Sequence, residues 1–162
     1  MRESIIVECY EEPPSAPVLE ALAAIQARAY EPTGMRAWTA EEIASMTAAP
    51  AGRLLVAYEK KVIPCGFILA TIWGEEGEIL ALAVNPDHTR KGIGSRLVDK
   101  LVDDVRCAKN FRFLLEVADT NLNALKFYEM LRFRQIGTRR DYYLIDSIRI
   151  DARLMERRFK WD

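Results

Sequence analysis

The stretch that decides the fold of this chain is Val84-Asn85-Pro86-Asp87-His88-Thr89-Arg90-Lys91-Gly92-Ile93-Gly94-Ser95. It follows an apolar, strand-like run over residues 79–84 and leads into a long amphipathic run that begins at Ile93. The free N–H groups at a helix start point outward, the helix dipole favours negative charge there, and glycines let a phosphate approach the backbone. We therefore expect a phosphate-bearing ligand at the start of this helix.

Two familiar glycine motifs do not fit this loop. A nucleoside-triphosphate loop needs a lysine directly after its second glycine, whereas Lys91 precedes Gly92 and no lysine follows Gly94. A dinucleotide fingerprint needs a third glycine three positions after Gly94, where this chain has Leu97. What remains is a short basic anion loop. The alternative is an ordinary strand-to-helix turn in which Gly92 and Gly94 supply unusual backbone angles, and the loop alone does not separate the two.

Composition indicates one ordinary globular domain. The chain has 162 residues, 50% hydrophobic and 29% charged, with a net charge of −1 that argues against a general nucleic-acid binder. Cys9, Cys65 and Cys107 are widely spaced, so we expect buried thiols in a reducing cytosol rather than a disulfide framework or a zinc site. We expect no signal peptide at Met1-Arg2-Glu3-Ser4 and no membrane span.

Apolar periodicity and turn residues predict the element order β-α-α-β-β-β-α-β-α-β-β, without internal repeats. The expected strands are 5–10, 53–58, 62–73, a strand ending at 84, 111–118, 134–143 and 150–159. The expected helices are 18–30, a short one from the Thr39/Glu42 capping box to about residue 47, 93–109 and 121–131. Strands flanked by helices in this order predict a mixed sheet that is covered on both faces.

Glu116 is a charge inside an apolar strand. Because strand 111–118 follows a crossover helix, it should lie parallel to and beside strand 79–84. A carboxylate on such a strand is costly unless it is paired or lies in a cleft. Two interpretations stay open: a general base at a ligand cleft, or a structural ion pair with one of three arginines, namely Arg112, Arg139 and Arg140.

Tyr128 follows twelve residues later, on the next expected helix. Its hydroxyl could point back at the carboxyl ends of the strands, or its ring could be a core aromatic at helical spacing. His88 is the only histidine, and we expect a loop residue there rather than a catalyst.

Four segments together resemble the GNAT family of N-acetyltransferases. They are 82–87 with 90–95, Leu115-Glu116-Val117, the pattern N-x-x-A-x-x-F-Y-x(4)-F from Asn121 to Phe133, and Arg139-Arg140-Asp141-Tyr142-Tyr143 with Asp151, Ala152 and Met155. Within the family the chain resembles the RimI-type branch, which acetylates protein N-termini and whose substrate is a small-subunit ribosomal protein. The resemblance implies a single domain over residues 1–162 with an α/β (α+β) fold. Its twisted central sheet would be mixed and mostly antiparallel, with six to seven strands and about four helices on both faces.

The resemblance also implies a cofactor site for acetyl-CoA and no metal. The backbones of Arg90, Lys91, Gly92, Ile93, Gly94 and Ser95 would hold the pyrophosphate. Leu82, Ala83 and Val84 would pair with the pantetheine arm, and Asn121 would contact the cofactor near the start of the last long helix. Glu116 would be the general base and Tyr128 the general acid.

These residue types suit acetyl transfer to an amine. An α-amino group titrates near ~8, so a carboxylate such as Glu116 is a sufficient base. The amine attacks directly, and we expect no acyl-enzyme at Cys107, which is predicted to lie in the middle of a helix. The acceptor should lie between loop 31–38 and hairpin 142–150. Four aromatic residues could line that groove or merely anchor its loops: Tyr30, Trp38, Tyr142 and Tyr143.

The expected acceptor is a protein or peptide N-terminus, with a small-subunit ribosomal protein as the implied case. We expect no nucleic-acid or membrane partner, a monomer or weak dimer, and a cytoplasmic location. Two alternatives stay open. One is acetylation of a small amine or a lysine side chain, for which an acidic acceptor pocket would be expected. The other is a non-catalytic CoA-binding module associated with the ribosome.

The chain departs from the family pattern in three places. Thr89 stands where glutamine or arginine is common, which backbone contacts should tolerate. Arg132 stands where a glycine usually ends the helix in a left-handed conformation. Segment 144–150 lacks the expected glycine, so the hairpin on the acceptor side should differ from that of its relatives.

Overall fold

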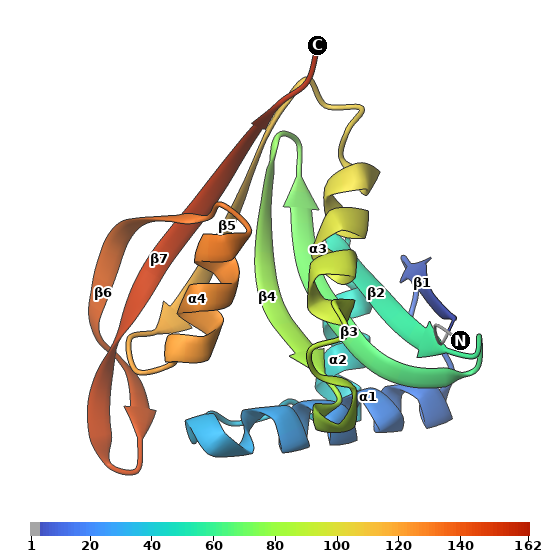
Figure 1. Cartoon of the computed structure of the whole chain (residues 1–162), viewed down its shortest axis with the longest axis horizontal. Coiled ribbons are helices and arrows are strands. Elements are labelled where there is room, and N and C mark those ends of the chain that lie inside the picture. The colour runs from blue at the N-terminus through green and yellow to red at the C-terminus, as the bar shows by residue number, and fades with distance from the viewer. Residues whose placement is uncertain (1–3) are drawn as a thin grey trace.

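Strand β4 (Glu76–Val84) lies at the centre of a seven-stranded sheet with the order β1-β2-β3-β4-β5-β7-β6 (Figure 1). The computed structural model describes residues 4–162, so the first three residues, where no signal peptide is expected, lie outside the described part. β4 and β5 are parallel and every other neighbouring pair is antiparallel. The predicted mixed, mostly antiparallel sheet and the predicted pairing of β4 with β5 are both confirmed.

The remaining elements follow the predicted order. The other strands are β1 (Ile5–Tyr10), β2 (Gly52–Glu59), β3 (Ile63–Trp73), β5 (Asn110–Ala118), β6 (Arg134–Ile145) and β7 (Ile148–Lys160). The helices are α1 (Ala16–Tyr30), α2 (Ala40–Ala48), α3 (Ile93–Asp104) and α4 (Leu122–Met130), with the 3₁₀ turns η1 (Glu31–Thr33) and η2 (Pro86–His88). The capping box of Thr39 with Glu42 starts α2 as predicted.

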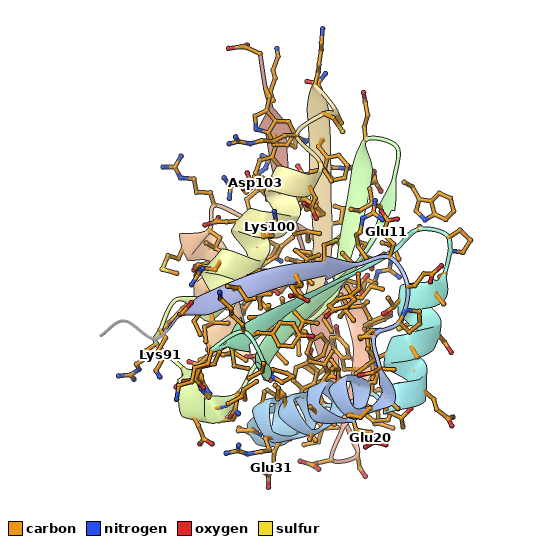
Figure 2. All side chains as sticks on the ribbon, turned by 90° about the vertical axis from the view of Figure 1, so that its right-hand side faces the viewer. Glu11, Glu20, Glu31, Lys91, Lys100 and Asp103 are labelled. Carbon is orange, nitrogen blue, oxygen red and sulfur yellow. The ribbon has the colours of Figure 1, made fainter. Side chains whose placement is uncertain are left out.

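Two apolar layers hold the helices on the sheet. Side chains alternate along β2, so Leu54 and Val56 face the layer under α1 and α2, whereas Leu55 and Ala57 face the layer under α3 and α4. Figure 1 shows α3 and α4 in front of the sheet and α1 across its lower end. Figure 2 shows Lys100 and Asp103 on the outer side of α3, and both are exposed.

A β-bulge at Leu80 opens the centre of the sheet. The register of β3 with β4 skips Leu80, so Ile79 joins the layer under α3 and α4 while Ala81 joins the layer under α1 and α2. Pairing of β4 with β5 stops at the same place, at Ile79 opposite Leu115. Beyond the bulge the two strands separate toward the lower end of the sheet (Figure 1).

One helix is shorter than predicted. The expected helix 93–109 ends at Asp104, and the chain continues in tight turns in which the Val105 N–H donates to the Val102 carbonyl. Five more helical residues would carry the chain about 7.5 Å further along the helix axis, whereas β5 must begin beside the start of β4. The chain therefore turns back to the start of β4, where the Arg112 N–H of β5 donates to the Glu75 carbonyl oxygen at 2.9 Å.

Two of the three cysteines also differ from expectation. Cys65 is buried, but Cys9 and Cys107 are exposed. Cys9 lies on the edge strand β1, on the side that faces α3 and close to Asp104, and Cys107 lies in the turn after α3 rather than in the middle of a helix. No helix within residues 4–162 is long and apolar enough to cross a membrane.

The terminal hairpin is longer than predicted. β6 ends two residues later than expected and β7 begins two residues earlier, so the strands meet in a two-residue turn, Asp146-Ser147. Both turn residues have positive φ, 50° and 64°, which is the conformation of a type I′ hairpin turn. The turn that lacks glycine is therefore made by two small polar residues.

Candidate active site

Two cavities adjoin where β4 leaves β5. The first, of about 390 Å³, lies between the end of β4, residues 88–95 and α4; we call it the loop cavity. The second, of about 420 Å³, lies between β4, β5, the segment after α1 and the β6–β7 hairpin; we call it the cleft cavity. Leu82, Ala124 and Tyr128 line both, so the two cavities meet at these residues.

The start of α3 opens into the loop cavity without a side-chain cap. Gly92 is the N-cap residue and has a φ of +75°, a left-handed conformation that glycine adopts without strain. Gly92 has no side chain with which to cap the helix, so the first N–H groups of α3 suit an anion. Gly94 has another role. A Cβ there would lie 3.1 Å from the Phe127 ring, so its small size lets α4 pack against α3.

Ion pairs fix the loop that precedes α3. His88 Nε2 lies 2.8 Å from Glu59 Oε2, and both side chains are largely buried. Arg28 of α1 donates to Asp87 and to Asn85. His88 is thus a loop residue, as expected, and its partner is at the end of β2.

Most residues predicted to bind the cofactor gather around the loop cavity. Those that line it are Leu82, Val84, Arg90, Gly92, Ile93, Gly94 and Ser95. Lys91 is exposed on the same loop (Figure 2). Ala83 faces the layer under α1 and α2. Asn121 lines the cleft cavity instead, and its Oδ1 accepts the Ala124 N–H at 3.2 Å and so caps α4. Contacts of these residues to a cofactor stay predictions.

Glu116 lies in the cleft cavity and is also ion-paired. Its side chain is 14% exposed, and Oε1 lies 2.8 Å from Arg139 Nε. Arg112 instead pairs with Glu76 and Glu156. The cleft location and the ion pair, which the sequence left as alternatives, therefore occur together at Glu116.

Tyr128 separates the two cavities and belongs to the core. Its ring packs on Phe133 with centroids 5.5 Å apart, and the Phe133 N–H donates to the Tyr128 carbonyl at the end of α4. Burial raises the pKa of the Tyr128 phenol, and the neighbouring Tyr30 adds to this. The phenol is therefore protonated near neutral pH and can act as a hydrogen-bond donor.

The four aromatic residues predicted for the acceptor groove all line the cleft cavity. Tyr30 and Trp38 come from the end of α1 and the segment before α2, and Tyr142 and Tyr143 from β6. Burial, followed by the charge of Glu116, raises the pKa of Tyr143 to about 12. The segment and the hairpin meet, because a Cβ at Gly34 would lie only 2.6 Å from Ile145 Cγ2.

The polar residues of the cleft cavity that were missed from the sequence include Gln26 and Glu78. Gln26 of α1 is fully buried, and its signal was an amide four residues after Leu22, on the apolar face of a helix. Glu78 is a carboxylate on the central strand β4, and burial followed by the charge of Glu116 raises its pKa. Within residues 4–162, no three His, Cys, Asp or Glu side chains group as metal ligands would.

The profile of the Acetyltransferase (GNAT) family matches residues 19–133. The chain belongs to the GNAT family. The matched range runs from α1 to the end of α4 and contains both the α3 start and Tyr128. The family resemblance of the sequence is thereby confirmed.

Individual proteins that resemble this chain include alanine N-acetyltransferases of a ribosomal protein. The ribosomal protein bS18-alanine N-acetyltransferase of Escherichia coli K12 is 33% identical over 89 residues, which cover 55% of this chain and 60% of that protein. The match thus spans less than two thirds of the relative's length.

Solved structures agree on the fold. The ribosomal-protein-S18-alanine N-acetyltransferase of Escherichia coli aligns with a TM-score of 0.81 at 24% identity, over 98% of this chain and 96% of that chain. Arabidopsis thaliana NAA60, solved in complex with acetyl-CoA, aligns with a TM-score of 0.74 at 17% identity, over 95% of this chain and 98% of that one. This GNAT chain therefore has the fold of N-acetyltransferases.

Proposed function

We propose that this chain transfers acetyl from acetyl-CoA to the N-terminal α-amino group of a protein, with a ribosomal protein as the first candidate. The observation that carries the proposal is that Tyr128 lines both cavities, with Glu116 in one and the uncapped start of α3 in the other. The name of the Escherichia coli relative supports the choice of acceptor.

The loop cavity suits a long ligand with an anionic end. The free N–H groups at the α3 start fit a pyrophosphate, and Leu82, Val84 and Phe127 provide an apolar wall. Because β4 has no strand partner on its β5 side beyond Ile79, backbone N–H and C=O groups of residues 80–84 on that side can pair with an extended arm. The thioester of bound acetyl-CoA would supply the acetyl group.

Glu116 acts as the general base in this proposal. The α-amino group of the acceptor, with a pKa near ~8, is partly neutral at neutral pH and loses its remaining proton as it attacks. Glu116, directly or through water, accepts that proton. Backbone N–H groups of residues 82–84 stabilise the negative charge that develops on the carbonyl oxygen.

Tyr128 acts as the general acid. Its phenol lies where the two cavities meet, and burial keeps it protonated. It donates a hydrogen bond to the departing sulfur and passes its proton to it, and the proton balance closes through Glu116 and solvent. No side-chain nucleophile takes part, since the amine attacks directly.

A small amine or a lysine side chain is the second candidate. The presence of both Glu78 and Glu116 in the cleft cavity favours a cationic acceptor. The cavity is not uniformly acidic, because Arg36 also lines it and Arg139 pairs with Glu116. The charge balance therefore favours an acceptor with one cationic end over a polyamine.

The test uses three acceptors with the purified chain and acetyl-CoA. They are a peptide that begins with alanine, an N-blocked peptide with one lysine, and spermidine. Mass spectrometry should find acetyl on the α-amine of the first peptide, with the highest kcat/KM of the three. A preference for either of the others would overturn the proposed acceptor.

Two substitutions test whether the chain is an enzyme rather than a CoA-binding module. Glu116→Gln and Tyr128→Phe should each lower kcat/KM by roughly 10²–10⁴-fold while acetyl-CoA still binds. Glu129→Gln, on the exposed side of α4, is the matched control and should change little. Unchanged rates in both site variants would remove the catalytic roles proposed here.

A further inference from the structure

Gln26 places a buried amide at the wall of the cleft cavity. It lies on α1 beside the buried Leu22 and Ile25, its side chain has no solvent exposure, and it lines the same cavity as Tyr30 and Glu116. A glutamine is rarely buried without hydrogen-bond partners for both of its polar atoms. The partners of this amide therefore show what the cavity can recognise.

One end of the amide is fixed by the backbone. The Trp38 N–H donates to Gln26 Oε1 at 2.9 Å, and because an N–H can only donate, the oxygen must face Trp38. The Nε2 group then lies on the other side of the amide. It makes no hydrogen bond of ordinary length and angle, although it is close enough to the Tyr30 hydroxyl to affect the pKa of that phenol.

Nε2 carries two N–H donors, so at least one remains unpaired even when the contact with Tyr30 is counted. A buried donor without an acceptor is destabilising, which favours a ligand that supplies one. The matching group is an oxygen acceptor, and a carbonyl is the acceptor that every peptide carries.

A peptide N-terminus carries such an oxygen close to its reactive amine. The first carbonyl is separated from the α-nitrogen by a single carbon, Cα, whatever the first side chain is. A lysine ε-amine or a polyamine has only methylene groups at that distance. A donor at the wall of the cavity therefore distinguishes the two classes of amine without reading the first side chain.

We propose that Gln26 Nε2 binds the first peptide carbonyl of the acceptor and thereby selects a peptide N-terminus over a lysine side chain or a polyamine. This inference rests on the proposed function and adds a specificity-determining residue to it. Gln26 acts through its contact with the acceptor, while Trp38 holds it in position.

The test compares two peptides that differ only in their first peptide bond. One begins with alanine, and the other has a trans-alkene in place of that bond, which keeps the shape but has neither the carbonyl nor the N–H. The native chain should prefer the ordinary peptide by roughly 10–100-fold in kcat/KM, the effect of leaving a buried donor unpaired. Equal rates for the two peptides would overturn the inference without the need for any variant.

Two variants distinguish binding of the acceptor carbonyl by Gln26 from a purely structural role of Gln26 in holding Trp38. Gln26→Glu keeps an oxygen for the Trp38 N–H but loses the donor, and Gln26→Met loses both. If Gln26 binds the carbonyl, both variants have a much lower kcat/KM for the ordinary peptide and a nearly unchanged kcat/KM for the alkene peptide. The ratio of the two kcat/KM values then falls toward one. If Gln26 only supports Trp38, kcat/KM falls equally for both peptides and their ratio stays as in the native chain, which overturns the inference.

The results for these acceptors also distinguish a failure of the Gln26 inference from a failure of the proposed function. A native chain that acetylates spermidine or lysine but neither peptide contradicts the proposed acceptor, and the role of Gln26 with it. A native chain that acetylates both peptides equally keeps the proposed acceptor and removes only the role of Gln26.

Discussion

Arg139 of β6 reaches across β7 to place its Nε 2.8 Å from Oε1 of Glu116 on β5. The reach is possible because Arg139 stands opposite Ala152 on β7, whose small side chain leaves room above the sheet. The ion pair ties the candidate base to the hairpin that borders the cleft cavity. It also gives Glu116 a cation with which an incoming ammonium group must compete.

We therefore expect Arg139→Gln to lower KM for a cationic acceptor severalfold and to leave KM for acetyl-CoA unchanged. The Arg139 side chain is 57% exposed, so its loss should change the free energy of unfolding by no more than about 1 kcal/mol. Arg140→Gln, on the exposed neighbour, is the matched control. Steady-state kinetics with a peptide acceptor provide the measurement, and a higher KM would mean that Arg139 itself binds the acceptor.

The pH profile of Tyr128→Phe tests the acid directly. Activity that needs a protonated phenol falls as pH rises through the pKa of that phenol. Burial raises the pKa of Tyr128 above its ordinary value of about 10, so this fall belongs above pH ~10. If kcat of the native chain falls at a pH below ~10, a group other than Tyr128 causes that fall. The Tyr128→Phe variant should therefore show the same fall at the same pH, with a lower kcat throughout. Tyr10→Phe, on the edge strand, controls for the removal of a hydroxyl.

Local patterns predicted the elements well because they depend on short-range physics. The capping box at Thr39 and the strand identity of β5 follow from residues within a few positions of one another. The end of α3 does not, since it is set by where β5 must begin. The turn at Asp146-Ser147 was missed because two non-glycine residues adopt the left-handed conformation there.

The site was predicted in part for a similar reason. Glu116 was visible as a charge inside an apolar strand, and Tyr128 was singled out by the family resemblance, but their partners come from distant segments. The choice of Arg139 over Arg112 depends on the register of three strands. Gln26 was missed, because a single amide beside the apolar residues of a helix carries no local signal, and only the fold shows that it meets a cavity.

Glu156 predicts an acid-dependent loss of stability. It is 2% exposed on β7 and pairs with Arg112, Arg134 and Arg158. Burial opposes its ionisation, but hydrogen bonds from Arg134 and Arg158 outweigh this and hold the pKa below its usual range. A lowered pKa in the folded state means that the unfolded chain binds the proton first, so stability falls as pH drops.

Glu156→Gln should accordingly destabilise the fold at neutral pH by about 1–3 kcal/mol. The difference from the native chain should stay constant above pH ~5 and shrink once the pH falls below the unfolded value of about 4.3. Urea unfolding at pH 7 and at lower pH measures both. Glu76→Gln, at the exposed end of the same network, should cost much less, and a pH-independent loss in Glu156→Gln would show that packing rather than charge is responsible.

Arg132 stands at the end of α4 in a left-handed conformation with a φ of +68°. The Arg132 N–H donates to the Glu129 carbonyl and the Phe133 N–H to the Tyr128 carbonyl, the two bonds of a Schellman motif. The sequence comparison expected a glycine here, and the structure shows that arginine takes the same backbone shape. This turn sets the position of Tyr128 through its contact with Phe133.

Arg132→Gly should therefore stabilise the chain. A left-handed conformation costs an L-residue roughly 1–2 kcal/mol, whereas the extra freedom of an unfolded glycine costs roughly 0.5–1 kcal/mol, so the net gain is up to about 1 kcal/mol.

The substitution also removes a cation near Arg157, whose pKa is lowered by burial and then by Arg132. Arg132→Ala removes that cation but keeps the strained backbone. A gain in thermal stability with glycine but not with alanine identifies the backbone as the cause, and equal gains identify charge repulsion. Unchanged kcat in both variants is expected, because neither alters the two backbone hydrogen bonds that hold Tyr128.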